Sequence, residues 1–539
     1  MKSRSVSAAA LLLLLALVAA TPPAASAQVR APRRRRLLSP SQISAAREDA
    51  ERSTRLISSC SERWHNTSLD HYAFRTAQKF PLRYYYCDEH YVPGGPIFFY
   101  VGNEADVTTF LNATGLMWEH AEHFNALLIF AEHRYFGESQ PFPDEPIDVY
   151  QEDPAELSQQ FAYLTVDQAI GDFVGLIYQL RKDLGDRHAP VIGFGGSYGA
   201  MLGTWMRMKF PHMITGMIAG SAVIGGFDDL DPPYDPGSFD EVVTEDAGPY
   251  GGASVDCVPN VNASWPVIAK LGETDDGRKQ LESIFNLCPD ETGKLNSTDD
   301  VSSFEELIQG AFENMAMGNW GISTNYFTGN GYLPAWPLRV ACDLMGNSSA
   351  RDNGTELLTN LAKVTNLYYN ATGEEKCLAW NTPTSSDDLR WSFLSCSSNY
   401  FNESTPPGTM FPPFSNANGL TSCNETWGFF PSPAYPYIHY GGIDIASGPS
   451  NIVFSNGLLD PWHPGGVLED LSDTLVAIVI PGEAHHADLA FSSPNDSEAL
   501  REARALEVDW IHRWIDEARE LHPSPFGAPA VEATPPLVE

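Results

Sequence analysis

The five residues Gly195-Gly196-Ser197-Tyr198-Gly199 constrain the fold of this chain more than any other feature. An apolar run at 190–194 precedes them and a segment of helical character at 201–210 follows, so the order predicts a strand, a sharp turn and a helix. In a G-x-S-x-G turn, the positions two before and two after the serine must be small because larger side chains would collide there. We therefore expect Ser197 to stand exposed at the carboxyl end of a strand, although a glycine-rich loop of another α/β protein would show the same pattern.

Strands and helices alternate on both sides of this turn. Runs that predict strands occupy residues 80–91, 96–101, 127–131, 215–224, 451–454 and 475–480, and segments that predict helices occupy residues 111–124, 166–184 and 497–521. This alternation is typical of an α/β protein with a mostly parallel sheet covered by helices on both faces.

The alternation fails between residues 226 and 440. This segment is rich in Asn, Ser, Pro, Trp and Gly and holds six of the eight cysteines. Its aromatic residues can build a core, so we expect an inserted, disulfide-stapled domain with helices such as 303–317 rather than a disordered spacer. The predicted organisation is a signal peptide at 1–27, a lead-in or propeptide at 28–79, a first α/β part at 80–225, the insertion at 226–440, a second α/β part at 441–521 and a flexible tail at 522–539.

The N-terminus has the features of a secretory signal peptide. A basic start is followed by an apolar run at 8–20 and by Ala25-Ser26-Ala27, which favours cleavage after Ala27. The run is too short to span a bilayer comfortably, and no other run approaches that length, so we expect no membrane insertion. The four arginines at 33–36 fit either a processing site or a charged linker.

Two further features agree with the secretory pathway. The eight cysteines form an even set without a C-x-x-C zinc pattern, so disulfides are expected in an oxidising compartment, with a pairing that the sequence leaves open. N-linked glycans are expected at the sequons, which begin at Asn66, Asn112, Asn262, Asn296, Asn347, Asn353, Asn370, Asn402, Asn424 and Asn495.

The net charge of −36 argues against a nucleic-acid partner, because binding to phosphates needs a basic surface. Such acidity fits an acidic compartment, where carboxylates begin to take up protons, but it also fits ordinary solubility. We therefore expect an extracellular or lysosome-like location, and the net charge does not distinguish these two locations. The oligomeric state stays open, a homodimer included.

Partners for a nucleophilic serine follow later strands. A serine nucleophile needs a base and an acid that orients the base, and in this kind of sheet the expected chain order is Ser, Asp or Glu, His. Asp460 lies in a loop after the predicted strand at 451–454, and His485 follows the strand at 475–480. Each alone could be an ordinary loop residue, but together with Ser197 they predict a catalytic triad.

Six motifs resemble a family of serine peptidases that includes lysosomal Pro-Xaa carboxypeptidase, dipeptidyl peptidase II and fungal prolyl endopeptidases. The resemblance runs from about residue 80 to 521. It implies an α/β-hydrolase fold with a largely helical cap inserted between nucleophile and acid, and hydrolysis of the bond after proline. The motifs are YVGNE at 100–104, AEHRYFGES at 131–139, GGSYG at 195–199, LPAWP at 333–337, SNGLLDPW at 455–462 and AHHADL at 484–489.

Residue by residue, the resemblance implies that Ser197 is the nucleophile, Asp460 the acid and His485 the base, with His486 as the rival of His485. The amide of Tyr198 should form half of the oxyanion hole, with a second donor from the Gly102-Asn103 turn. Met201 and Trp462 correspond to positions that line the proline pocket, although ordinary core packing also explains Met201. Candidate partners for a substrate terminus are Glu104 for an amine and His463, if protonated, for a carboxylate.

Some positions depart from the family pattern. Ala200 stands where a second glycine is common, Ala487 and Ala490 replace a leucine and an arginine, and His463 follows Trp462. None removes a catalytic group, but they weaken inference about the substrate subsites.

We favour a serine exopeptidase of the Pro-Xaa carboxypeptidase type that acts on proline-containing peptides and needs no metal or organic cofactor. A dipeptidyl peptidase or prolyl endopeptidase of the same family is the first alternative. An esterase or lipase and a catalytically silent binding protein are more distant ones.

Overall fold

A computed structural model describes residues 51–73, 76–142, 158–228, 230–329, 331–382, 385–399, 401–416 and 418–527. The predicted signal peptide and the four arginines lie outside these residues. Within the described part of the chain, no helix is long and apolar enough to cross a membrane.

The core of the fold is one eight-stranded sheet with the order β1-β2-β4-β3-β5-β6-β7-β8. The first two pairings, β1 with β2 and β2 with β4, are antiparallel, and the other neighbours pair in parallel. The strands are β1 (Ser61–Ser68), β2 (Lys79–Cys87), β3 (Ile97–Tyr100), β4 (Leu127–Ala131), β5 (Val191–Gly196), β6 (Gly216–Gly220), β7 (Ile452–Gly457) and β8 (Leu475–Ile480). The predicted α/β fold class is confirmed.

Helices cover both faces of this sheet. On β6, the backbone of Gly216 lies against the ring of Trp514 in α16 (Glu498–Leu521), whereas the side chain of Met217 lies against Gly203 in α6 (Tyr198–Lys209). Consecutive residues of a strand point to opposite faces, so α16 and α6 lie on opposite sides. The helices α2 (Val107–Ala113), α3 (Gly115–Phe124) and α5 (Val166–Leu184) complete the cover.

Three predicted elements have the bounds of the observed ones: β4, β8 and α5. The helix predicted at 111–124 is instead two helices, α2 and α3, with Thr114 between them. The strand predicted at 80–91 ends at Cys87.

The sequence did not predict β1. Its residues are mostly polar and exposed at one edge of the sheet, so it lacks the apolar run that marks other strands; β8, at the opposite edge, keeps such a run. β1 lies within the range assigned to the lead-in, so this range contributes a strand to the sheet.

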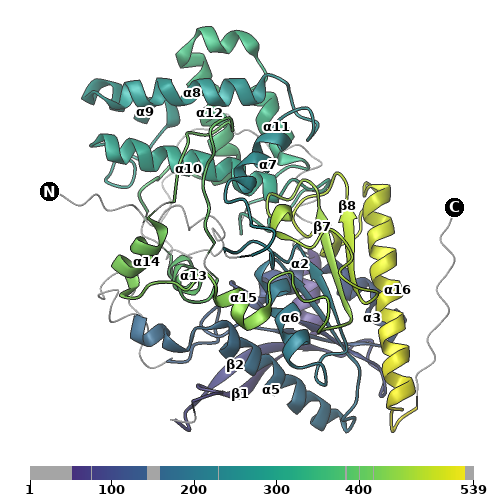
Figure 1. The fold of residues 1–539 in the computed structure, drawn as a ribbon. Helices are drawn as coiled ribbons and strands as arrows, with labels where there is room; N and C mark the ends of the chain where they lie inside the picture. Colours follow the sequence, from purple (N-terminus) through teal and green to yellow (C-terminus); the bar gives the residue numbers. More distant parts are fainter. Residues whose placement is uncertain are drawn as a thin grey trace, which may run out of the picture.

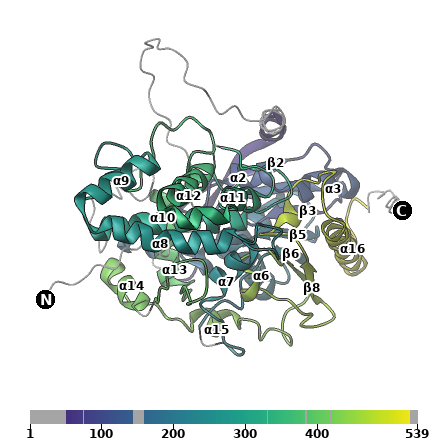
Figure 2. The ribbon, with the colours of Figure 1, turned by 90° about the horizontal axis from the view of Figure 1, so that it is seen from above.

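Between β6 and β7 the chain forms a largely helical cap, which lies above the sheet in Figure 1. In the view from above, α8, α10 and α12 run side by side, in agreement with their mutual contacts (Figure 2). The cap helices are α7 (Ser238–Asp246), α8 (Cys257–Gly272), α9 (Asp275–Phe285), α10 (Thr298–Met317), α11 (Pro337–Leu344), α12 (Gly354–Tyr369), α13 (Ser386–Ser397), α14 (Gly419–Trp427) and α15 (Tyr435–Tyr440).

All eight cysteines form disulfides, which confirms that expectation and supplies the pairing. Cys60–Cys87 ties the segment before β1 to the end of β2. The other three bonds, all within the cap, are Cys257–Cys342, Cys288–Cys377 and Cys396–Cys423.

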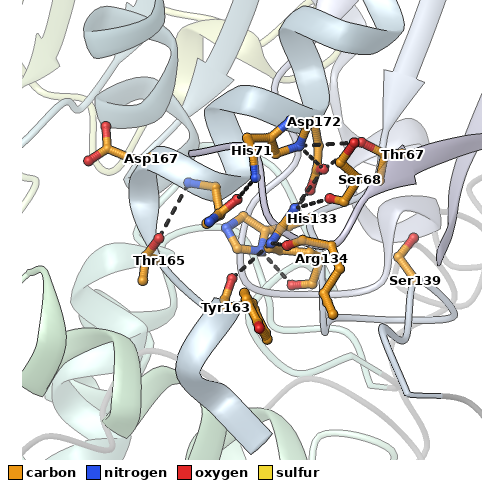
Figure 3. Close-up of polar contacts among 12 residues, drawn as sticks. Thr67, Ser68, His71, His133, Arg134, Ser139, Tyr163, Thr165, Asp167 and Asp172 are labelled. Carbon is orange, nitrogen blue, oxygen red and sulfur yellow. Dashed lines mark hydrogen bonds and ion pairs between the residues drawn. The ribbon is translucent and has the colours of Figure 1, made fainter. Parts of the chain in front are cut away.

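A buried ion pair anchors the AEHRYFGES motif (Figure 3). Arg134, which follows β4, donates from Nε and Nη2 to the two carboxylate oxygens of Asp172 in α5, at 2.6 and 2.7 Å. Thr67 and His71 bind the same carboxylate, each at 2.8 Å. A buried ion pair is stable only when its remaining donors are satisfied, and Arg134 also donates to the carbonyls of Ser68, Leu69 and Tyr163.

A pair of buried carboxyls joins two cap helices. Asp240 of α7 and Glu313 of α10 are neighbours, because the amide of Gln309 donates to both, and the charge of Asp240 raises the pKa of Glu313. Gln309 donates to Glu313 Oε1 at 2.7 Å, Thr405 donates to Asp240, and the described residues place no cation in an ion pair with either acid. Burial raises the pKa of Asp240 to about 6 and that of Glu313 well above its usual value, and it raises the pKa of the neighbouring Glu403 to about 8.

We expect the thermal stability of the protein to fall as the pH rises from about 4 through about 8, the range between the ordinary carboxyl pKa and the raised pKa of Glu403. The folded state still binds protons that the unfolded chain releases near pH 4, so a rise in pH favours the unfolded chain. A pKa shift of about two units corresponds to a decrease of a few kcal/mol in the free energy of unfolding. Glu313→Gln removes one of the two neighbouring carboxyls and its effect on the pKa of Asp240, so this dependence should flatten. Melting curves from pH 4 to 8 would show it, with Glu241→Gln, exposed on α7, as the control. Equal pH slopes in Glu313→Gln and wild type would contradict the prediction.

Candidate active site

Ser197 lies on the tight turn between β5 and α6. Its backbone has φ 55° and ψ −127°, a region that L-residues rarely adopt. A Cβ on Gly195 would lie 2.5 Å from the carbonyl oxygen of Gly199, and one on Gly199 would lie 2.7 Å from that of Val101. The collisions expected from the sequence are therefore present, and they require glycine at both positions.

The backbone beside Ser197 offers hydrogen-bond donors. The N–H of Tyr198 belongs to the first turn of α6, where amide groups have no partner within the helix. The segment after β3 packs against the same turn, because a Cβ on Gly199 would meet the side chain of Asn103 at 3.3 Å. The turn that carries Tyr198 is therefore packed against the segment that carries Gly102 and Asn103, as an oxyanion hole with donors from both would require.

Asp460 and His485 form a direct pair. His485 Nδ1 donates to Asp460 Oδ2 at 2.8 Å, and both side chains are almost fully buried. Burial alone would raise the pKa of Asp460, but the charge of His485 and hydrogen bonds from His485, the Trp462 N–H and Ser221 hold it below its usual range. The other ring nitrogen, Nε2, is buried and has no hydrogen-bond partner in the described part of the chain. It is therefore available to a serine hydroxyl.

His486 has a different environment. Its ring packs against Gly196, next to Ser197, and meets Trp320 and Tyr326 edge-on. Burial and the charge of His485 lower the pKa of His486 well below its usual value. His486 therefore places the histidine loop against the serine turn, but His485 is the residue that pairs with the acid.

Ser221 was not singled out from the sequence, although it contacts both sides of this pair. Its hydroxyl accepts the N–H of His486 at 2.9 Å, and it lies near enough to Asp460 to help lower the pKa of that carboxyl. Ser221 follows β6 with a φ of 55°, and its neighbours in space come from two distant segments. No local pattern in the sequence marks such a residue.

The predicted substrate-binding residues lie in three places. Met201 is buried in the second turn of α6. Trp462 is buried against the rings of Phe239 and Phe401, with centroids 4.7 and 5.6 Å away. Glu104 is buried near His485, and burial raises its pKa to about 7.

His463 is tied to the acid loop, because its Nδ1 lies 2.8 Å from the carbonyl oxygen of Asp460.

A cavity of about 930 Å³ opens beside the histidine loop. It is lined by Trp320, Tyr326, Ala490 and Phe491, so one of the positions that departs from the family pattern faces this space.

The described residues contain no group of three or more His, Cys, Asp or Glu side chains that could hold a metal ion. What they do bring together is a strained serine, a buried Asp–His pair and backbone donors at one end of a mostly parallel sheet. This sheet order and this site define an α/β hydrolase of the serine type.

The chain belongs to the serine carboxypeptidase S28 family, whose model matches residues 67–507. The protein is therefore a serine-type peptidase, which confirms the resemblance seen in the sequence.

Curated relatives cover most of the chain. Human lysosomal Pro-X carboxypeptidase is 39% identical over 468 residues, which is 84% of this chain and 89% of the relative. Prolyl carboxy peptidase like protein 5 of Caenorhabditis elegans is 33% identical and covers 83% of this chain and 89% of its own. The thymus-specific serine protease of Mus musculus is 25% identical, and the alignment covers 85% of this chain and 88% of the relative. Among solved structures, proline iminopeptidase of Mycobacterium smegmatis aligns with 85% of this chain and 100% of its own, at 12% identity and a TM-score of 0.32.

Proposed function

We propose that this protein hydrolyses the peptide bond on the carboxyl side of proline through Ser197, Asp460 and His485, as an exopeptidase of the Pro-Xaa carboxypeptidase type. The observation that carries the proposal is the hydrogen bond between His485 Nδ1 and Asp460, which leaves Nε2 without a partner among the described residues. The adjacent ring of His486 packs against Gly196 of the Ser197 turn. The S28 family match and the 39% identity to a Pro-X carboxypeptidase support the substrate class.

In this mechanism Ser197 Oγ attacks the carbonyl carbon of the proline residue while His485 Nε2 takes the hydroxyl proton. The tetrahedral oxyanion receives hydrogen bonds from the Tyr198 amide and from the Gly102-Asn103 turn. His485 then protonates the leaving amine, and water hydrolyses the acyl-enzyme by the reverse sequence. Asp460 keeps the imidazole in the required tautomer and stabilises its charged form, and its lowered pKa keeps it ionised in mildly acidic solution.

The proline ring is proposed to lie against Trp462 and Met201. A flat, rigid pyrrolidine suits an apolar slot with an aromatic wall. The packing of Trp462 between Phe239 and Phe401 supports this role, because it would hold the indole in one orientation. Glu104 is a candidate partner for a substrate amine, although its raised pKa makes it neutral in acidic solution.

We further propose that the protein enters the secretory pathway and acts in the lysosome or outside the cell. The lysosomal relatives support this location, as do the predicted signal peptide and the four disulfides. N-linked glycans at the sequons belong to the same proposal.

Mass spectrometry of products from one proline-containing peptide tests the proposed activity. The peptide carries Pro as its penultimate residue and at position 2, and is supplied unblocked, N-acetylated, C-amidated and blocked at both ends. We expect release of the C-terminal residue from the unblocked and N-acetylated forms only. Release of an N-terminal dipeptide would instead identify a dipeptidyl peptidase, and cleavage of the doubly blocked form an endopeptidase. Turnover of acyl esters without any prolyl cleavage would favour the esterase alternative.

A further inference from the structure

The cap holds the main chain of His485 from both sides. The N–H of His485 donates to the carbonyl of Met317, the last residue of α10, at 3.3 Å. The carbonyl of His485 accepts from the indole Nε1–H of Trp320 at 3.1 Å. The imidazole is therefore fixed by Asp460 of the hydrolase core, and its backbone is fixed by the cap.

The cap segment that makes these bonds is itself firmly anchored. Trp320 is buried, and its ring stacks on Tyr326 and meets Phe327 edge-on, both at 5.7 Å between centroids. The N–H of Trp336, in the LPAWP motif, donates to the carbonyl of Trp320 at 2.7 Å. These contacts hold Trp320 in one place. Its hydrogen bond to the carbonyl of His485 therefore also holds the backbone of His485 in place.

Such a clamp matters for catalysis because the base must lie within hydrogen-bond reach of the serine. A misplacement of about 1 Å can lower the rate about 100-fold. Among the described residues His485 Nε2 has no hydrogen-bond partner, so the place of the ring depends on Asp460 and on the backbone of His485. The Trp320 donor is well placed to set that backbone.

We propose that Trp320 is a positioning residue for the catalytic base, and that the cap thereby takes part in the chemical step as well as covering the site. Trp320 acts through the main chain of His485 and not by contact with the reacting atoms. The inference rests on the proposed role of His485.

The test is Trp320→Phe, which removes the indole N–H but keeps an aromatic ring. The matched control is Trp265→Phe in α8, because Trp265 is also a buried cap residue whose Nε1 donates to a carbonyl, that of Met410, at 2.7 Å. Loss of a buried hydrogen bond should destabilise both variants to a similar extent.

We expect Trp320→Phe to lower kcat about 10- to 100-fold with KM changed less than about twofold, while Trp265→Phe keeps kcat within about twofold of wild type. The same contrast should appear in the rate at which a fluorophosphonate labels Ser197. A purely structural role would give equal kcat values in the two variants, and a role in substrate binding would change KM alone. Either result would overturn the inference.

The labelling rate also separates this inference from the proposed function. Fluorophosphonate attack needs a serine activated by its base but does not need a prolyl substrate. Wild type that labels rapidly but cleaves no prolyl peptide would refute the substrate class and still allow the comparison of Trp320→Phe with Trp265→Phe. Slow labelling of Trp320→Phe alone would then support the inference by itself.

Discussion

Replacing Ser197 with alanine is expected to lower kcat for a prolyl peptide by about 10⁵-fold or more, with KM changed little. The nucleophile is lost, and the oxyanion donors and substrate contacts that remain supply only about 10³- to 10⁴-fold over water. The variant should fold, because alanine keeps the backbone and removes only the hydroxyl. Its positive φ costs no more with alanine than with serine.

The measurement is steady-state turnover of a prolyl peptide, with Ser302→Ala, an exposed serine on α10, as the control. Peptide mapping after treatment with a fluorophosphonate should place the label on Ser197 in wild type and in the control. Unchanged turnover in Ser197→Ala, with the label on another serine, would refute the mechanism.

The two adjacent histidines should respond very differently to substitution. His485→Gln is expected to lower kcat by about 10⁴-fold or more, because glutamine cannot act as a base and the hydrogen bond to Asp460 no longer orients an imidazole. His486→Gln should cost less than about tenfold, because His486 makes no hydrogen bond to Asp460 in the structure and its lowered pKa keeps it neutral.

Both histidines are buried, His486 against Trp320 and Tyr326 and His485 against Asp460, so both replacements are expected to lower the melting temperature. The value of kcat per folded molecule, and not the melting temperature, should therefore distinguish the two variants. A larger loss of kcat in His486→Gln, once corrected for unfolded protein, would reverse the assignment of the base.

One of the cap carboxyls lies on a helix that also contacts the catalytic loop. The Asp240–Glu313 pair sits on α7 and α10, and α10 ends at Met317, which binds the backbone of His485. Loss of stability at rising pH should therefore appear in the cap, and stability and activity should be measured on the same samples.

Much of the fold could be read from local patterns. The apolar strands β4 and β8 and the amphipathic helix α5 have the predicted bounds, because each has a continuous apolar run or a clear helical period. The edge strand β1 and the break at Thr114 were missed. A polar edge strand and a break within a helical pattern carry no such periodicity.

By itself, the sequence determined the turn at Ser197, the chain order of Ser197, Asp460 and His485, and the presence of disulfides. These follow from local steric rules and from residue types at the ends of strands. Only the tertiary structure decided that Asp460 pairs with His485 and not with His486, which cysteines join, and that Trp320 of the cap holds the catalytic loop. Each of these depends on distances between segments far apart in the chain, and two adjacent histidines are distinguished only by which of them the folded backbone turns toward the acid.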